Sequence, residues 1–493
     1  MILSLLVFLP LLGALAIALL PVRDDRAIKI TAALFTAASL VISGWVFVQA
    51  YFFMWLNPGD FQPLFVERVS WIPQLNSYYY LGVDGLSLPM VILTTVIGFL
   101  SVLVSWNITL RVREYFAWLL VLETGVLGVF TSLDLLLFFL FWEVELVPMY
   151  LLISIWGSAP PLGRREYSAM KFLIYTIFGS AFMLVGVLAV LFSAGTLDMR
   201  ELATVPLREA ILPVSVLFWL FFIAFAIKLP MFPFHTWLPD AHTDAPTAVS
   251  VMLAGVLLKM GGYGMLRICV SMFPEAAQTY APLLAALAAI GIVYGALVAL
   301  RQTDLKRMIA YSSVSHMGYV LLGIAALGEV GLTGAVLGMF THGTITGLLF
   351  ALVGLIYDRA HTREIPRLRG LAHQMPFIAT VFVVAGLASL GLPSMSGFVA
   401  ELLVFLGAFP RHAVWTVIGV TGVVLAAGYI LWTVERILFR QPDPHFDELR
   451  DASVLEAVPL SVLVALIMVI GVRPTLLTNV IQHGIAPIIL RLG

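Results

Sequence analysis

The sequence predicts an all-α integral membrane protein, and three observations lead to that fold class. Only 11% of the 493 residues are charged and 61% are apolar, whereas a soluble globular chain has about 25% charged residues. The mean hydropathy is +1.03, which favours a hydrocarbon environment. The apolar residues come in runs long enough to cross a bilayer core of about 30 Å as helices, and we predict no strands.

Fourteen of these runs are candidate membrane-spanning helices. They lie near 2–21, 29–55, 84–106, 114–131, 133–157, 169–194, 211–236, 246–270, 280–300, 305–327, 332–357, 374–408, 412–437 and 456–473. The first run has no basic segment before it, so its length favours a first span over a cleaved signal peptide. We therefore predict about 14 transmembrane helices.

Lysine and arginine residues are distributed unevenly between the two sets of loops. With the N-terminus outside, most of the 27 Lys and Arg residues fall in inner loops, as Arg23, Arg301 and Arg363 do. Few fall outside, among them Arg200 and Arg208. Inner loops are enriched in these residues, so we expect both termini on the outer side, which is the lumenal side of a thylakoid.

Two connections stand out by composition. Residues 52–83, which include WLNPGDFQPLF, are predicted to form a long outer loop rich in aromatic residues and proline. Residues 439–455 are the most polar inner connection, and we expect a short surface helix there. No linker separates a soluble domain.

Two predicted helices are interrupted in a similar manner, at Lys228-Leu229-Pro230 and at Gly391-Leu392-Pro393. Paired broken helices in two halves of a transporter indicate inverted repeats, with ion sites where the breaks free backbone groups. The expected division is 1–110 for helices 1–3 with the outer loop, 111–272 for a first repeat (helices 4–8, helix 7 broken), 273–438 for a second, inverted repeat (helices 9–13, helix 12 broken) and 439–493 for the inner connection and helix 14.

Five ionisable groups lie deep in predicted spans, where a charged lysine costs ~3 kcal/mol on insertion scales. They are Glu143 in LFFLFWEVELVPMY, Lys228 in FAIKLPMF, Lys259 in VMLAGVLLKMGGYG, His316 in AYSSVSHMGYVLL and Glu401 in GFVAELLVFLG. An isolated carboxylate takes up a proton in such a place and an isolated lysine loses one, whereas opposite charges side by side keep each other ionised. Such groups suit a proton relay. The alternatives are buried structural ion pairs, a lysine whose head reaches the interface, and a hydrogen-bonded core histidine.

A second set of candidates comprises Glu123, His342, Lys306 and Glu145. Glu145 is two residues from Glu143 and would point to a different helix face, so the two do not form a carboxylate pair. Lys306 lies at an inner helix end, where it is either an orientation signal or a proton entry point. Glu123 could pair with a lysine or simply line its helix, and His342 lies among threonines that could bind water.

Three polar residues where helix 7 re-emerges, His235, Asp240 and His242, are expected to cap helices and hydrogen-bond to loops. Asp84, in VDGLS, is expected to cap the third helix.

Composition and missing motifs exclude several functions. A net charge of -1 leaves no basic excess for binding nucleic acid. The single cysteine, Cys269, excludes internal disulfides, four-cysteine iron–sulfur clusters and zinc ribbons. There is no P-loop, no dinucleotide-binding glycine motif after a strand, and no histidine pairing typical of haem. We expect no cofactor and no metal in this chain, and no electron transfer through it.

Three stretches resemble the antiporter-like membrane subunits of respiratory complex I. They are FFLFWEVELVPMYLLISIWG, FAIKLPMFPFHTWLPDAHTDAPTAVSVMLAGVLLKMGGYGMLR and DLKRMIAYSSVSHMGYVLLGI, and the likeness runs over essentially the whole chain. The M type of these subunits is the nearest, because Glu401 stands where its relatives usually carry lysine and because little sequence follows the last predicted span. Glu145 departs from the simplest form of the pattern.

The resemblance implies roles for the buried charges. Glu143 and Lys228 would form an interacting pair, Lys259 would connect towards the middle of the membrane, and Glu401 would be the terminal proton-handling residue. His316 and His342 would belong to the polar axis between them. The resemblance also implies proton movement driven by redox chemistry elsewhere, with FMN, iron–sulfur clusters and quinone held by other subunits.

The same resemblance implies L-like and N-like antiporter subunits, small membrane subunits and lipids as partners, in a bacterial inner (plasma) membrane or a thylakoid membrane. Alternative functions are a subunit of an Mrp-type Na+/H+ antiporter, a structural membrane scaffold whose charges only lock helices together, and a quinone-binding redox subunit.

Overall fold

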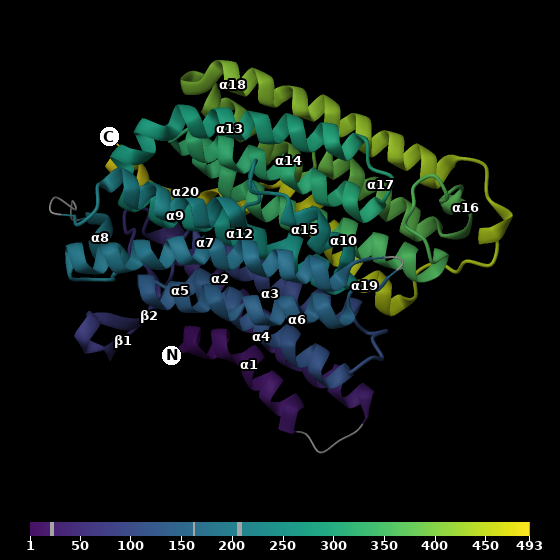
Figure 1. Cartoon of the computed structure of the whole chain (residues 1–493), viewed down its shortest axis with the longest axis horizontal. Coiled ribbons are helices and arrows are strands. Elements are labelled where there is room, and N and C mark those ends of the chain that lie inside the picture. Colours follow the sequence, from purple (N-terminus) through teal and green to yellow (C-terminus); the bar gives the residue numbers. More distant parts are fainter. Residues whose placement is uncertain (20–23, 161–162, 205–209, 493) are drawn as a thin grey trace.

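A computed structural model describes residues 1–19, 24–160, 163–204 and 210–492 of the chain. Arg23 and Arg208, counted above for orientation, lie outside these residues. The helices run roughly parallel in one elongated bundle (Figure 1), and a small hairpin and both chain ends lie at the same end of it. We call this the hairpin end and the other the opposite end.

The elements follow the chain in this order. The first part contains α1 (Ile2–Leu19), α2 (Asp25–Leu56), β1 (Leu64–Ile72), the 3-10 turn η1 (Pro73–Leu75), β2 (Ser77–Val83), α3 (Ser87–Val104), α4 (Val112–Thr131), α5 (Leu135–Val144), α6 (Leu146–Trp156), α7 (Arg165–Ala194), α8 (Met199–Thr204), α9 (Val214–Lys228), α10 (Trp237–Asp244) and α11 (Thr247–Met252). The second part contains the π-helix η2 (Leu253–Leu257), α12 (Leu258–Gly264), the π-helix η3 (Met265–Val270), α13 (Pro274–Leu300), α14 (Leu305–Ala325), α15 (Glu329–Ala360), α16 (Leu371–Gln374), α17 (Pro376–Ser389), α18 (Ser396–Val434), the π-helix η4 (Glu435–Phe439), the 3-10 turn η5 (Pro444–Phe446), α19 (Val454–Val472) and α20 (Thr475–Leu492).

The prediction of an all-α membrane protein with about 14 spans is confirmed. Among the described residues, 12 helices are long and apolar enough to cross a bilayer, and two further crossings are interrupted. One is α9 and α10, broken after Lys228, and the other is α17 and the first part of α18, broken at Gly391. Helix α18 then continues through a kink with non-helical backbone at His412, close to the boundary predicted between two spans.

Two features of the hairpin end were not predicted. Part of the outer loop 52–83 is not irregular, because β1 and β2 pair antiparallel, so the prediction of no strands is wrong there. Helix α20 was also missed, since its sequence is less apolar than a typical span; it packs against α15 and α3. The short surface helix expected in 439–455 is the 3-10 turn η5.

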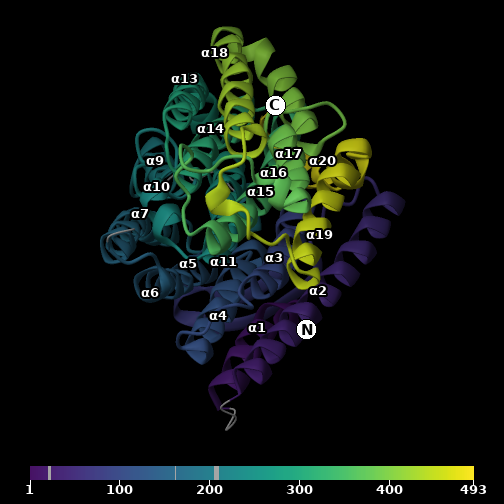
Figure 2. The same ribbon diagram turned by 90° about the vertical axis from the view of Figure 1, so that its right-hand side faces the viewer.

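The centre of the bundle consists of two segments. The apolar stretches of Thr247–Val270 and of α15 are entirely buried, whereas less than a third of those in α2 and α19 is. Figure 2, which looks along the bundle, shows α11 and α15 in the middle and α2, α7 and α18 at the periphery. A charged side chain on the two central segments is therefore shielded from lipid by surrounding helices.

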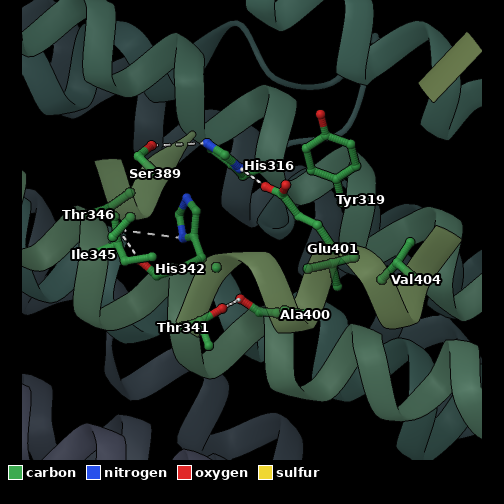
Figure 3. Close-up of a pocket in the computed structure, with 14 residues that line it drawn as sticks. His316, Tyr319, Thr341, His342, Ile345, Thr346, Ser389, Ala400, Glu401 and Val404 are labelled. Atoms are coloured by element: carbon green, nitrogen blue, oxygen red, sulfur yellow. Dashed lines mark hydrogen bonds and ion pairs between the residues drawn. The ribbon is translucent and has the colours of Figure 1, made fainter. Parts of the chain in front are cut away.

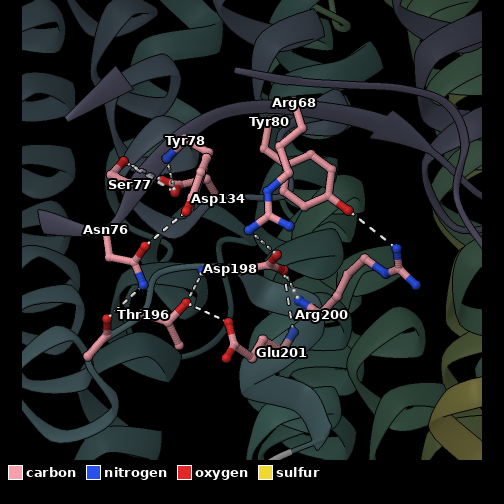
Figure 4. Close-up of polar contacts among 11 residues, drawn as sticks. Arg68, Asn76, Ser77, Tyr78, Tyr80, Asp134, Thr196, Asp198, Arg200 and Glu201 are labelled. Carbon is pink, nitrogen blue, oxygen red and sulfur yellow. Dashed lines mark hydrogen bonds and ion pairs between the residues drawn. The ribbon is translucent and has the colours of Figure 1, made fainter. Parts of the chain in front are cut away.

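Polar contacts connect the hairpin to the bundle (Figure 4). The carboxylate of Asp134 accepts hydrogen bonds from backbone N–H groups in the first turn of α5 and from the backbone N–H of Tyr78 in β2, at 2.9–3.0 Å. Arg68 of β1 forms an ion pair with Asp198 at 3.3 Å. Capping a helix with a carboxylate satisfies N–H groups that have no partner inside the helix, so the hairpin sits on the start of α5.

The start of α3 is held in a similar way, and the predicted cap by Asp84 is confirmed. Its Oδ1 accepts from the backbone N–H groups of Leu86 and Ser87 and from the guanidinium of Arg267 at 2.6 Å. Burial alone would raise the pKa of Asp84, but the Arg267 charge and these hydrogen bonds outweigh it and hold the pKa below its usual range.

We predict that Asp84→Asn destabilises the protein at neutral pH by about 1–3 kcal/mol, the usual worth of hydrogen bonds to a charged group. Because the folded pKa of Asp84 is lowered, the stabilisation is complete above the unfolded pKa of about 3.9 and is lost as the pH falls through the folded value. Thermal unfolding of both forms across this range should show the difference shrinking in acid. Asp60→Asn is the control, since Asp60 is exposed and, within the described part of the chain, accepts a hydrogen bond only from the N–H of Gln62. A difference independent of pH would contradict the prediction.

Candidate functional site

The first group of buried charges lies where α9 stops. Lys228 is the last residue of α9 and is 1% exposed. The following Leu229-Pro230 cannot continue the helix, because proline has no N–H to donate and clashes with the preceding turn. The indole N–H of Trp237, at the start of α10, donates to the carbonyl of Ile227 at 3.0 Å and so satisfies one of the acceptors that the break leaves free.

The direct partner of Lys228 is Glu145, whereas Glu143, which was predicted to form an interacting pair with Lys228, interacts with it electrostatically and without a direct contact. The ammonium of Lys228 donates to Oε1 of Glu145, which is fully buried. Glu145 is the single residue between α5 and α6, and its position two residues after Glu143 turns it towards α9. Glu143 is half-buried, contacts the hydroxyl of Ser180 and lies within electrostatic range of Lys228.

Aromatic rings enclose this pair. The ammonium of Lys228 lies 5.6 Å from the centre of the Trp142 ring and 5.4 Å from that of Phe172. Ring faces attract cations, most strongly where water is excluded. Among the described residues, Oε2 of Glu145 and Oε1 of Glu143 have no hydrogen-bond partner, so both carboxylates keep free capacity to accept a proton or a water.

The second group begins at Lys259, on the fully buried central segment. Lys259 lies in α12, which has a π-helix on either side, and π-helical turns in α-helices are frequent at functional sites. Its ammonium donates to the carbonyl of Ala254 and lies 2.8 Å from Nδ1 of His342, on α15. Lys259 is 0% exposed, and no carboxylate contacts it among the described residues.

Lys259 and His342 begin a row of four titratable groups, which continues through His316 to Glu401 on the second broken helix (Figure 3). The rings of His342 and His316 are 5.8 Å apart between centres. His316 lies 3.6 Å from Glu401, between Nδ1 and Oε1, and its Nε2 lies 3.3 Å from the hydroxyl of Ser389. Four of the five predicted site residues are therefore at hydrogen-bonding or near-contact distance from another titratable group.

A small cavity joins the end of this row. It has a volume of about 30 Å³ and is lined by His316, Thr341, His342, Ser389 and Glu401, among others. A cavity needs about 10–15 Å³ and two to four polar partners to hold a water molecule. The space between His342 and Glu401 is thus large and polar enough for one or two waters.

The remaining predicted residues lie apart from this row. Glu123 of α4 is 1% exposed, and its carboxylate lies over Gly98 of α3, where any Cβ would come within 2.7 Å of it. Lys306 is 5% exposed, donates to the carbonyl of Ala245 at 2.5 Å, and lines a cavity of about 580 Å³ at the opposite end of the bundle.

His242 is a functional candidate that the sequence reasoning missed. The expected loop hydrogen bonds are absent among the described residues, because neither ring nitrogen has a partner. The ring is fully buried and stacks on Phe350 at 4.4 Å, and it lies within electrostatic range of both Lys306 and Lys259. The available signal in the sequence was the position of His242 in HTWLPDAH, shortly after the break at Lys228-Leu229-Pro230. His235 likewise has two unpartnered ring nitrogens, whereas Asp240 pairs with Lys171 at 2.7 Å.

The fold and the row of buried groups define a class: a multi-pass membrane protein that moves protons or other cations. Residues 132–426 match the family described as NADH:quinone oxidoreductase/Mrp antiporter, transmembrane. The NADH-quinone oxidoreductase subunit M of Rhodobacter capsulatus is 42% identical over 99% of this chain and 96% of its own length. A NAD(P)H-quinone oxidoreductase chain 4 of Synechococcus is 44% identical over 97% of this chain and 90% of its own.

A solved structure agrees. A chain of respiratory complex I from Thermus thermophilus superposes with a TM-score of 0.89 at 30% identity, over 100% of this chain and 99% of that chain. The chain therefore belongs to the NADH:quinone oxidoreductase/Mrp antiporter family of transmembrane subunits, among the relatives named subunit M or chain 4.

Gly391 offers a test of the Glu401 end of the row. It has φ +79, and a Cβ there would lie 2.6 Å from Oε2 of Glu401. We predict that Gly391→Ala costs about 1–2 kcal/mol of backbone strain and also displaces the carboxylate from His316. Gly195→Ala is the matched control, because Gly195 has φ +69 but nothing within 4 Å of a Cβ. Thermal stability should fall in both variants, and proton transfer only in Gly391→Ala; equal proton transfer would contradict the placement of Glu401.

Proposed function

We propose that this chain translocates protons across the membrane as the M-type subunit of an NAD(P)H–quinone oxidoreductase. The observation that carries the proposal is the row Lys259, His342, His316 and Glu401, in which each member lies near the next. The named relatives and the superposition on complex I support the assignment to such an enzyme complex.

In this proposal the row passes protons between Lys259 and Glu401. An amine, two imidazoles and a carboxyl each gain and lose a proton, and the water-sized cavity lined by both histidines and Glu401 adjoins the widest separation, the 5.8 Å between the two imidazole ring centres. Lys228, with its neighbours Glu143 and Glu145, responds to charge changes arriving from a neighbouring subunit. Each proton moved against 100 mV costs about 2.3 kcal/mol, so the work comes from redox chemistry elsewhere in the complex.

The proposed points of proton entry and proton exit lie near the two ends of the row. Lys306, in its cavity at the opposite end, is the proposed entry point, with His242 between it and Lys259. Glu401, beside the helix break, is the proposed exit, because a break frees backbone groups and admits water. Glu123 is assigned a secondary role, since its carboxylate lies against Gly98 and its Oε1 has no hydrogen-bond partner among the described residues.

Topology and repeats belong to the same proposal. We place both termini on the outer side, because basic residues concentrate in the other set of loops and both chain ends lie at the hairpin end (Figure 1). The broken helices α9/α10 and α17/α18 support repeats over 111–272 and 273–438. The membrane is a bacterial plasma membrane or a thylakoid.

The subunit is proposed to have no redox activity of its own. The FMN, iron–sulfur clusters and quinone are assigned to other subunits, since one cysteine cannot supply the four thiolates of a cluster. L-like and N-like antiporter subunits, small membrane subunits and lipids are the proposed neighbours.

A subunit of an Mrp-type Na+/H+ antiporter is the second candidate, because the matched family includes both kinds of complex. The two differ in driving force. Neighbouring genes for hydrophilic flavin and iron–sulfur subunits would support the oxidoreductase, and their absence with sodium-driven exchange in vesicles would support the antiporter.

We predict that Lys259→Ala lowers proton uptake per quinone reduced by about tenfold or more, because it removes the first carrier of the row. The measurement is proton uptake by vesicles containing the assembled complex. Lys29→Ala is the matched control, since Lys29 is also buried but its one hydrogen bond to the described residues goes to the carbonyl of Trp106, at 2.8 Å. Loss of assembly with normal pumping in the assembled fraction would instead support the scaffold alternative.

A further inference from the structure

Three ionisable side chains meet at the junction of α5, α6 and α9. They are one lysine, Lys228, and two carboxyl groups, Glu143 and Glu145. Among the described residues, no second cation is within reach of either carboxyl group. Two carboxylates with one ammonium leave one negative charge uncompensated in a medium where an uncompensated charge costs several kcal/mol. Uptake of a proton by one of the two carboxyl groups would remove this uncompensated charge.

The surroundings of the two carboxyl groups differ. Glu145 is 0% exposed and contacts the lysine directly. The backbone around it is held tightly, because a Cβ on Gly125 of α4 would lie 3.2 Å from the amide nitrogen of Glu145. The carbonyl of Glu145 also accepts the first backbone hydrogen bond of α6, from Met149 at 3.2 Å. Glu145 thus has little freedom to leave Lys228.

Glu143 is less buried than Glu145 and less constrained by its neighbours. It is half-buried, and the neighbouring side chains Leu140, Val144 and Val147 are 38%, 39% and 53% exposed, so this face of the bundle is left uncovered by the rest of the chain. On the protein side it adjoins the hydroxyl of Ser180, which donates to the backbone carbonyl of Thr176 at 2.8 Å and whose oxygen can accept from a carboxyl group. The group can therefore change its protonation without breaking an ion pair.

We propose that Glu145 is a positioning residue, the fixed counter-ion that keeps Lys228 in place and charged, while Glu143 is the exchangeable carboxyl group of the site. This inference rests on the proposed proton translocation and assigns different roles to the two carboxyl groups. A proton enters when an O–H bond forms at Glu143 and leaves when that bond breaks, and the Lys228–Glu145 pair persists through both steps. Without Glu145, Lys228 would pair with Glu143 and hold it ionised.

The test compares Glu145→Gln with the wild type in the assembled complex. Glutamine keeps the size and can still accept a hydrogen bond from Lys228, so a purely structural role would leave function unchanged. We expect proton uptake per quinone reduced to fall by about threefold or more, and Glu145→Asp, which restores the charge, to recover most of it. Glu114→Gln is the matched control: Glu114 is 46% exposed and pairs with Arg111 at the start of α4, and its loss should change nothing.

The outcomes separate this inference from the proposed function. Normal pumping in Glu145→Gln together with loss of pumping in Lys228→Ala would overturn the role of Glu145 alone. Normal pumping in Lys228→Ala would overturn the proposed function of this group. If Glu145→Gln fails to assemble, the double variant with Lys228→Met decides: assembly restored by removing both charges supports the pair, and assembly still lost contradicts it. An experimental map with Lys228 on Glu143 would also contradict it.

Discussion

The cost of placing a charge in hydrocarbon governs the arrangement of this protein. Lys228 and Lys259 are each no more than 1% exposed, and neither can remain charged there without compensation. The structure compensates them in two ways. Lys228 receives a full negative charge from Glu145, whereas Lys259 receives only a backbone carbonyl and an imidazole nitrogen. The first lysine therefore has an ionic partner, whereas the second contacts only uncharged acceptors.

The interruptions of the helices coincide with the buried charged residues. Lys228 ends α9, Glu145 separates α5 from α6, and Lys259 lies between two π-helical turns. An uninterrupted α-helix uses its own carbonyl groups internally, whereas a break or a π-turn leaves some of them free to accept from a lysine or a water. The ammonium of Lys259 donates to the carbonyl of Ala254, which lies in the π-helical turn η2. Backbone irregularity and buried charge thus occur together for one physical reason.

The depth of the row follows from packing. Lys259 and His342 are carried by the two segments that other helices enclose completely, while Glu143 and Glu401 lie nearer the periphery and are less buried. Surrounding helices separate the charges in the middle of the bundle from lipid. Glu143 and Glu401 are less buried and so lie closer to neighbouring subunits or water. A row with an insulated middle and accessible ends can conduct protons without a continuous open pore.

Composition and run length determined the fold class, the approximate number of spans and the two broken helices. A run of about 20 apolar residues that crosses a bilayer must hydrogen-bond its own backbone groups, and an α-helix does this within the segment. Intramembrane position also singled out Glu143, Lys228, Lys259, His316 and Glu401. The tertiary structure decided that Glu145, and not Glu143, contacts Lys228. It also decided that the buried ring of His242 lies within electrostatic range of two lysines, and it formed the β-hairpin and α20. Those features depend on which helix face meets which neighbour, and sequence spacing within one helix carries no information about the helix packed against it.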